Sequence, residues 1–247
     1  MRIRKEIFTG LMVIMLLVAG FSMFMRYQTD KGRSAFAKEL AELGNNPTES
    51  IESLKRAIEL YEKRIEQHVN DAAQTGIYWK ILATRFQSRG FHGDALKALE
   101  RAIEYNPVDP TLHHLTGISA TVTAKSKHDF TGTGSGEKIM YFNLAESAFL
   151  RAIDIDPNYM RPRYSLGVLY AYDMDRYEEA ITHLTKAMSL IPGDIDTMFA
   201  LAYAYVGASF YREAVEVYDM IIRQTKDKER LRNAQEFRQT IMSRIYG

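Results

Sequence analysis

Small side chains recur along this chain at a fixed interval, and their recurrence limits its fold more than any other feature. Each series of them advances by 34 or 35 residues, apart from one step of 50 residues. The three series are Ala83, Gly117, Gly167 and Ala202; Ala95, Ala145, Ala180 and Ala214; and Ala102, Ala152 and Ala187, which ends in Ile221. Because antiparallel helices approach closely only where small side chains face each other, this period predicts one helical hairpin in each of four units.

Prolines mark the end of three of these units. Each follows the second series by twelve residues, at Pro107, Pro157 and Pro192. A proline ring cannot continue a helix, so each is expected to end the second helix of its hairpin. The long step falls inside the second unit, which predicts a flexible loop over residues 124–138, inserted between the two helices of that hairpin.

Larger residues surround the small ones in a pattern that resembles the tetratricopeptide repeat. In the first unit the matching positions are Trp79, Leu82, Ala83, Phe86, Gly90, Ala95, Ala102 and Pro107. In the third unit they are Leu166, Gly167, Tyr170, Tyr177, Ala180, Leu184, Ala187 and Pro192. The second unit keeps Gly117, Phe142, Ala145, Phe149, Ala152 and Pro157, and the fourth keeps Leu201, Ala202, Tyr205, Tyr211, Ala214 and Tyr218. The resemblance implies an all-α solenoid of stacked antiparallel hairpins, with four repeats over residues 76–223.

Amphipathic helices are expected on both sides of these repeats. Residues 47–75 follow a good N-cap residue, Asn46, and begin with Pro47, which suits the first helical position. Their apolar side chains recur at helical spacing, at Ile51, Leu54, Ile58, Tyr61, Ile65 and Val69. This leading helix resembles the second half of a degenerate repeat. Residues 224–247 are expected to form the capping helix that covers the last apolar surface of a solenoid. Their apolar face consists of Leu231, Ala234, Phe237, Ile241 and Ile245.

The N-terminus departs from this globular pattern. After a basic start in residues 1–6, residues 7–25 contain no charged side chain. At about 1.5 Å per residue they are long enough to span a bilayer core of about 30 Å. We expect one transmembrane helix here, a juxtamembrane linker over residues 26–46, and the bulk of the chain on the extracytoplasmic side of the membrane. A basic start before an apolar core also fits a cleaved signal peptide, so a soluble exported protein is the alternative.

Several kinds of chemistry find no support in these residues. The chain has no cysteine and a formal net charge of +1, which argues against thiolate metal sites, cysteine nucleophiles and nucleic-acid partners. The glycine-rich stretch 132–138 is not a phosphate loop, because Glu137 separates glycine from Lys138. His113 and His114 point about 100° apart on a helix and cannot chelate one ion together. We expect no catalytic residues, no metal, no cofactor and no enzymatic activity.

The resemblance also implies a concave groove lined by the first helix of each hairpin. The residues that it places in the groove are Lys80, Thr84, Gln87, His114, Arg161, Tyr164, Val168, Tyr172, Phe199 and Tyr203. Aromatic side chains together with cations suit an extended or helical peptide. Lys80 and Arg161 match cationic positions of the repeats that clamp a C-terminal carboxylate. Thr84, Leu115 and Ser165 stand where those repeats carry asparagine or arginine, so the clamp is incomplete and chaperone-tail binding is not expected.

These features predict a membrane-anchored scaffold or adaptor that binds a protein or peptide partner in its groove. A small-molecule or lipid-binding component associated with a membrane transporter is an alternative of a different class. Self-association through the ends of the solenoid is a third hypothesis. An unusually closed cavity favours the small ligand over the peptide.

Overall fold

The structure is a computed structural model that describes residues 38, 51–127 and 135–246. The basic start (1–6), the predicted transmembrane segment (7–25) and, apart from residue 38, the predicted linker (26–46) lie outside these residues. Within the described ranges, no helix combines the length and the apolar composition needed to cross a membrane. The same ranges consist of helices and turns without a strand, which confirms the all-α class for this part of the chain.

The helix α2 (Ile51–Ser88) runs for 38 residues without a break. The sequence predicts a boundary at residues 75 and 76 between a leading helix and the first repeat, and the structure corrects this prediction. Residues 70–76 contain no proline, and Gly76 alone destabilises a helix by only about 1 kcal/mol relative to alanine. Nothing therefore ends the helix there. Gly76 instead provides room for Tyr105 in α3 (His92–Tyr105), because a Cβ at Gly76 would lie 2.8 Å from the Tyr105 Cβ.

The chain divides into two compact units, one up to Asp71 and one from Ala72 onward. In the first unit, the described part of α2 carries Ile58, Ile65 and Val69 on its surface, with exposed fractions between 50% and 62%. The predicted hairpins all fall in the second unit, which is described by itself below.

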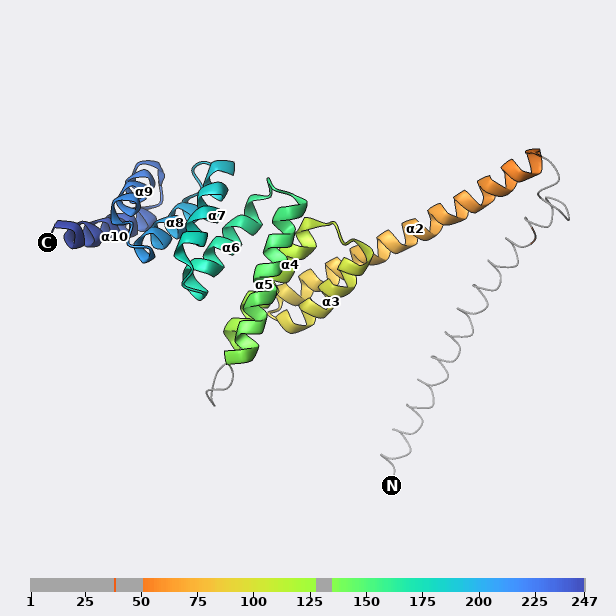
Figure 1. Cartoon of the computed structure of the whole chain (residues 1–247), viewed down its shortest axis with the longest axis horizontal. Helices are drawn as coiled ribbons and strands as arrows, with labels where there is room; N and C mark the ends of the chain where they lie inside the picture. Colours follow the sequence, from red (N-terminus) through yellow and green to blue (C-terminus); the bar gives the residue numbers. More distant parts are fainter. Residues whose placement is uncertain (1–37, 39–50, 128–134, 247) are drawn as a thin grey trace, which may run out of the picture. The chain divides into compact units, whose positions relative to one another are not determined.

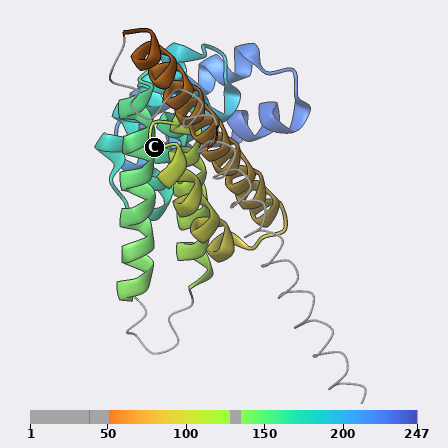
Figure 2. The same ribbon diagram turned by 90° about the vertical axis from the view of Figure 1, so that its right-hand side faces the viewer.

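The helices that follow α3 form a continuous stack. They are α4 (Pro110–Ser126), α5 (Ser135–Ile155), α6 (Met160–Asp173), α7 (Tyr177–Leu190), α8 (Ile195–Gly207), α9 (Tyr211–Gln224) and α10 (Lys228–Tyr246). Each helix from α3 onward contacts the next one along the chain, and both Figure 1 and Figure 2 show α4 and α5 side by side. Because α6 also contacts α4 and α8, the first helices of successive hairpins line one face. This is the arrangement of a solenoid.

The recurrent small residues lie where the helices touch. Every alanine of the three series, and Ile221, is fully buried. A methyl group on Gly167 would overlap Leu184 of α7, and one on Gly117 would overlap the ring of Phe149 in α5. The two helices of these hairpins therefore approach to a distance that a larger side chain would prevent.

The turns inside three hairpins share one backbone conformation. Gly90, Asp175 and Ser209 have positive φ angles of 80°, 52° and 64°. The next residue in each turn donates its N–H to a carbonyl of the preceding helix. These bonds run from Phe91 to Phe86, from Arg176 to Tyr170 and from Phe210 to Tyr205, at 2.9, 3.0 and 2.8 Å. The last carbonyl groups of a helix have no N–H donor within the helix. A residue in the left-handed conformation lets the N–H of the next residue bond to one of these carbonyls.

The first helices α4 and α8 begin at aspartate N-caps. The Asp109 carboxylate accepts a hydrogen bond from the N–H of Thr111 at 2.8 Å, and Asp194 accepts one from the N–H of Thr197 at 3.0 Å. The negative charge also suits the positive end of the helix dipole.

The sequence predicts a loop over residues 124–138, but both ends of this range are helical in the structure. Helix α4 continues to Ser126 and α5 begins at Ser135, while residues 128–134 lie outside the described part of the chain. Ala124 is fully buried, and Lys127 Nζ lies 2.9 Å from Glu137 Oε2. The insertion therefore lengthens both helices, because neither of its ends contains a proline that would stop them.

The close approach at Gly167 makes a testable prediction. Gly167→Ala should lower the free energy of unfolding by about 1–3 kcal/mol, because the added methyl group overpacks the contact with Leu184. Urea unfolding followed by circular dichroism measures this change. Gly93→Ala is the matched control: no atom lies within 4 Å of the added Cβ, so we expect stability to stay unchanged or to rise by up to about 1 kcal/mol, because alanine favours the helix over glycine. Equal effects of the two substitutions would contradict the role assigned to Gly167.

Candidate functional site

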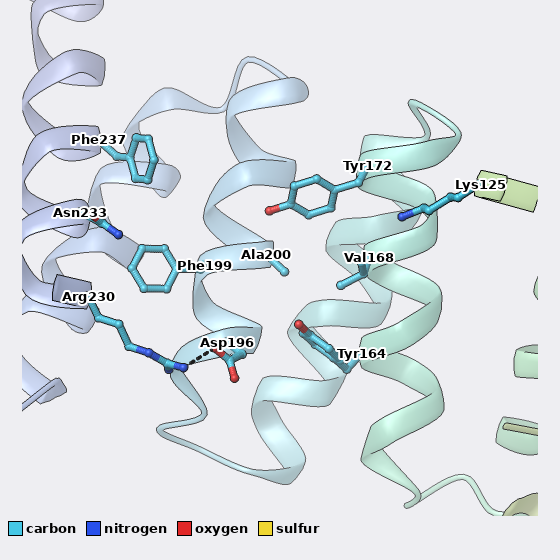
Figure 3. A pocket seen from close by; sticks show the side chains of 10 residues that line it. All are labelled: Lys125, Tyr164, Val168, Tyr172, Asp196, Phe199, Ala200, Arg230, Asn233 and Phe237. Carbon is cyan, nitrogen blue, oxygen red and sulfur yellow. Dashed lines mark ion pairs between the residues drawn. The ribbon is translucent and has the colours of Figure 1, made fainter. Parts of the chain in front are cut away.

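Three helices in the C-terminal half of the chain surround one groove. Helices α6 and α8, the first helices of the last two hairpins, and α10 enclose a cavity of about 520 Å³. Its lining residues are Lys125, Tyr164, Val168, Tyr172, Asp196, Phe199, Ala200, Arg230, Asn233 and Phe237. Figure 3 shows the α6 residues on one side, the α10 residues on the other and the α8 residues between them.

A second cavity, of about 440 Å³, adjoins the first and has a mostly aromatic and aliphatic lining. Its residues are Tyr172, Phe199, Tyr203, Val206, Tyr218, Phe237, Thr240, Ile241 and Arg244. Because Tyr172, Phe199 and Phe237 line both cavities, the two form one continuous groove. The rings of Tyr172 and Tyr203 stack with their centroids 4.0 Å apart. Burial raises the pKa of both Tyr172 and Tyr218 to about 12, so their hydroxyls are uncharged at neutral pH.

Polar and ring contacts fix the register of α10 against α8 and α9. They are Arg230–Asp196 at 3.0 Å, Arg238–Asp219 at 2.7 Å and Tyr218–Phe237 with ring centroids 5.9 Å apart. Partly exposed ion pairs contribute only about 0–1 kcal/mol each, so they orient the helix more than they stabilise it. Burial of Ala234 and Ile241 anchors α10 to the stack. This register sets which α10 side chains reach the groove.

The structure brings together five of the residues that the sequence places in the groove. Tyr164, Val168, Tyr172 and Phe199 line the larger cavity, and Tyr203 lines the apolar one with Tyr172 and Phe199. Helix α10 contributes further lining residues, which are absent from the groove predicted from the sequence. These are Arg230, Asn233, Phe237, Thr240, Ile241 and Arg244. The apolar face predicted for residues 224–247 is the sequence feature that indicates these residues. As a capping helix, this segment was expected only to cover the end of the stack.

Three predicted groove residues on α2 form hydrogen bonds within the chain. Lys80 Nζ lies 2.7 Å from Asp109 Oδ2. Burial opposes the ionisation of Asp109, but hydrogen bonds from Lys80 and Thr111 hold the pKa of its carboxyl below the ordinary value. Gln87 Nε2 donates to the carbonyl of Leu115 at 2.9 Å and to Ser119 Oγ at 2.7 Å, and the Thr84 hydroxyl donates to the carbonyl of Lys80. The bonds of Lys80 and Gln87 connect α2 with α4 and its N-cap, whereas the bond of Thr84 stays within α2. None of the three residues lines the cavities around α10.

His114 is not on the accessible surface, which corrects its placement in the groove. Its side chain is only 6% exposed and its ring lies 5.9 Å from that of Phe149. Its Nε2 is 3.2 Å from Ser165 Oγ and its Nδ1 is 3.3 Å from Tyr159 Oη. Burial, together with the nearby charge of Arg161, lowers the pKa of His114 to about 4. His114 is therefore a neutral side chain inside the stack, while Arg161 itself is exposed.

Comparison with known proteins finds similarity to one repeat family over part of the chain. Residues 171–236 match the family model of the tetratricopeptide repeat. Over these residues the chain is similar to the tetratricopeptide repeat. The matched range runs from the end of α6 into α10, so it contains most of the groove. The solved structure of MamA, residues 41 to the end, from Desulfovibrio magneticus RS-1 aligns with a TM-score of 0.52 and 16% identity; the alignment covers 68% of this chain and 94% of that one.

Two curated proteins are similar over most of this chain. A TPR repeat-containing protein of Borreliella burgdorferi is 24% identical over 197 residues, which make up 78% of this chain and 81% of that protein. Anaphase-promoting complex subunit 3 of Schizosaccharomyces pombe is 23% identical over 206 residues, which make up 81% of this chain but only 28% of that protein. Tetratricopeptide-repeat proteins are generally interaction scaffolds without catalytic activity.

The buried His114 predicts a loss of stability in acid. Its pKa is about 4 in the folded chain and about 6.5 when solvated, so the unfolded chain binds more protons between these values. The neutral His114 therefore contributes its full share to the free energy of unfolding above about pH 6.5. As the pH drops towards 4, this contribution falls by roughly 3 kcal/mol in total. Urea unfolding at pH 7 and pH 4.5 measures this difference.

A substitution at the same position tests the assignment. His114→Gln keeps a donor and an acceptor for Ser165 and Tyr159 but cannot be protonated, so its stability should change less between the two pH values. His113→Gln, at the neighbouring position, should retain the wild-type dependence. An unchanged dependence in His114→Gln would show that another group causes the acid sensitivity.

Proposed function

We propose that this chain is a membrane-anchored adaptor that binds a protein or peptide partner in the groove between α6, α8 and α10. The observation that carries this proposal is the groove itself, where half-exposed aromatic side chains from three helices line two adjoining cavities. Exposed apolar surface of this kind is costly to hydrate and marks interaction sites. Because the helices are held in place by their repeats, the groove loses little entropy when it binds.

The membrane part of the proposal rests on sequence. Residues 7–25 are uncharged, follow a basic start and have the length of one bilayer span. We propose a single-pass anchor with the repeats on the extracytoplasmic side; a cleaved signal peptide with an exported soluble repeat domain is the alternative. An anchor would raise the local concentration of the repeats near partners in the same membrane and so strengthen weak contacts.

One observation favours a second candidate function. The 440 Å³ cavity has the size and apolar lining of a small-molecule site, which fits a lipid-binding or small-molecule-binding component of a membrane transporter. It adjoins, however, the 520 Å³ cavity, whose lining is partly charged and partly apolar, and the two share Tyr172, Phe199 and Phe237. A peptide that runs along the groove uses both cavities. Mass spectrometry of extracts from the purified chain distinguishes the two functions, since only a small-ligand site should retain a lipid in stoichiometric amount.

Capture of partners from native membranes tests the adaptor function. We expect cross-linking of the full chain to trap a discrete protein, and the double variant Tyr172→Ser with Tyr203→Ser to lose it. Both rings are 40–48% exposed, so their removal should weaken binding at least about tenfold while leaving the fold intact.

Tyr246→Ser is the matched control, because Tyr246 is 75% exposed on α10 but lines neither cavity. Circular dichroism must first show equal helicity for all variants. Capture that persists in the double variant would place the partner on another surface and remove the groove from the proposal.

A further inference from the structure

Three half-exposed aromatic rings converge on the apolar cavity from three different helices. Tyr172 on α6, Tyr203 on α8 and Phe237 on α10 are 48%, 40% and 51% exposed. Phe199 and Val206, which line the same cavity, are only partly exposed. Tyr218 and Ile241, each 5% exposed, also line the cavity. A pocket with aromatic walls and an apolar floor is suited to one large apolar side chain of a ligand.

The single charge that lines this apolar cavity is positive. Arg244 lies in the last turn of α10, and no ion pair joins it to an acidic residue in the described ranges. The other cations of the groove are compensated: Arg230 is 3.0 Å from Asp196, and Lys125 Nζ is 2.9 Å from Asp173. An uncompensated guanidinium at the edge of an apolar pocket favours a ligand that brings a carboxylate to that edge.

The larger cavity contributes an amide that suits a peptide backbone. Asn233 lines this cavity, and its side chain has no hydrogen-bond partner among the residues that the structure describes. Figure 3 shows Asn233 on α10 next to Phe237 and facing the same groove. A free amide offers both a donor and an acceptor, which matches the N–H and C=O of a peptide unit. The hydrocarbon tail of a fatty acid or lipid has neither group, so Asn233 favours a peptide.

Spacing along α10 sets the length of this ligand. Asn233, Phe237, Thr240 and Arg244 follow one another by three or four residues and share one face of the helix. The eleven steps from Asn233 to Arg244 correspond to about 16 Å of helix axis at about 1.5 Å per residue. An extended chain covers that distance in about five residues.

We propose that α10 completes a binding site for an extended acidic peptide segment with one large apolar side chain. The apolar side chain enters the cavity between Tyr172, Tyr203 and Phe237, a carboxylate within about five residues pairs with Arg244, and the backbone bonds to Asn233. This inference rests on the proposed function, since it names the partner chemistry for the same groove. It also gives the last helix a role in recognition beyond covering the end of the stack.

Selection from a random peptide display library against the full chain in detergent micelles tests this proposal. We expect the enriched peptides to combine Leu, Met, Phe or Trp with Asp or Glu about two to five positions away. Binding of the best peptide, measured by fluorescence anisotropy, should weaken as salt increases, because it includes an ion pair.

Charge reversal on α10 isolates the role of Arg244. Arg244→Glu should remove the preference for acidic peptides and weaken the best peptide at least about tenfold, while the preference for a large apolar residue persists. Arg244→Gln should show the same direction with a smaller effect. Arg232→Glu is the matched control on the same helix, because Arg232 is 67% exposed, lines neither cavity and pairs only loosely with Glu236 at 3.8 Å. The thermal midpoints must agree with that of the wild type.

Several outcomes would overturn this inference without affecting the adaptor function. Enriched peptides without an acidic preference, or an acidic preference that survives Arg244→Glu, would exclude the assigned carboxylate site. An empty selection would exclude the peptide site even if partner capture still depended on Tyr172 and Tyr203. Saturable binding of oleate that Arg244→Glu abolishes, with no peptide enriched, would assign the groove to a lipid. Failure of both peptide selection and partner capture would count against the proposed function itself.

Discussion

The close approach of helices at small residues is the contact on which the rest of this structure depends. Gly117 and Gly167 leave room for Phe149 and Leu184, and alanines fill the corresponding positions elsewhere. Only this spacing allows short helices to bury enough apolar surface against their neighbours, since a single hairpin has too little core of its own. Because each hairpin is oriented by the one before it, the first helices share a face. The groove is a product of that stacking and has no local sequence motif of its own.

The two halves of that face differ in what their side chains do. In the N-terminal part, Lys80, Gln87 and His114 form hydrogen bonds or ion pairs within the chain. Partly buried polar groups need such partners, because an unpaired one loses its hydration without compensation. In the C-terminal part, Tyr172 and Tyr203 stack on each other but remain half exposed. A ligand that covers the exposed surface of these rings gains the free energy of burying it. We therefore place the binding site there.

The last helix has two roles that arise from one amphipathic face. Its buried residues Ala234 and Ile241 cover the end of the stack, as expected for residues 224–247. Phe237 belongs to the same apolar face but is 51% exposed, because the groove opens beside it. A helix that only covered the core would bury this ring. Arg230 and Arg238 hold α10 in a register in which the same helix both covers the end of the stack and lines the groove.

The sequence alone determined the repeat period, the all-α class and the position of most helices, because these follow from local spacing and from the size of side chains at contacts. The resemblance to a known repeat also placed Tyr164, Val168, Tyr172, Phe199 and Tyr203 on the concave face, and in the structure they line the two cavities. The tertiary structure decided three things that spacing cannot encode. The helix α2 continues past residue 75, His114 is buried, and α10 contributes a wall of the groove. The burial of His114 and the position of α10 depend on how neighbouring helices are oriented, and packing over the whole stack sets that orientation. The continuity of α2 follows instead from the absence of a residue between 70 and 76 that would end the helix.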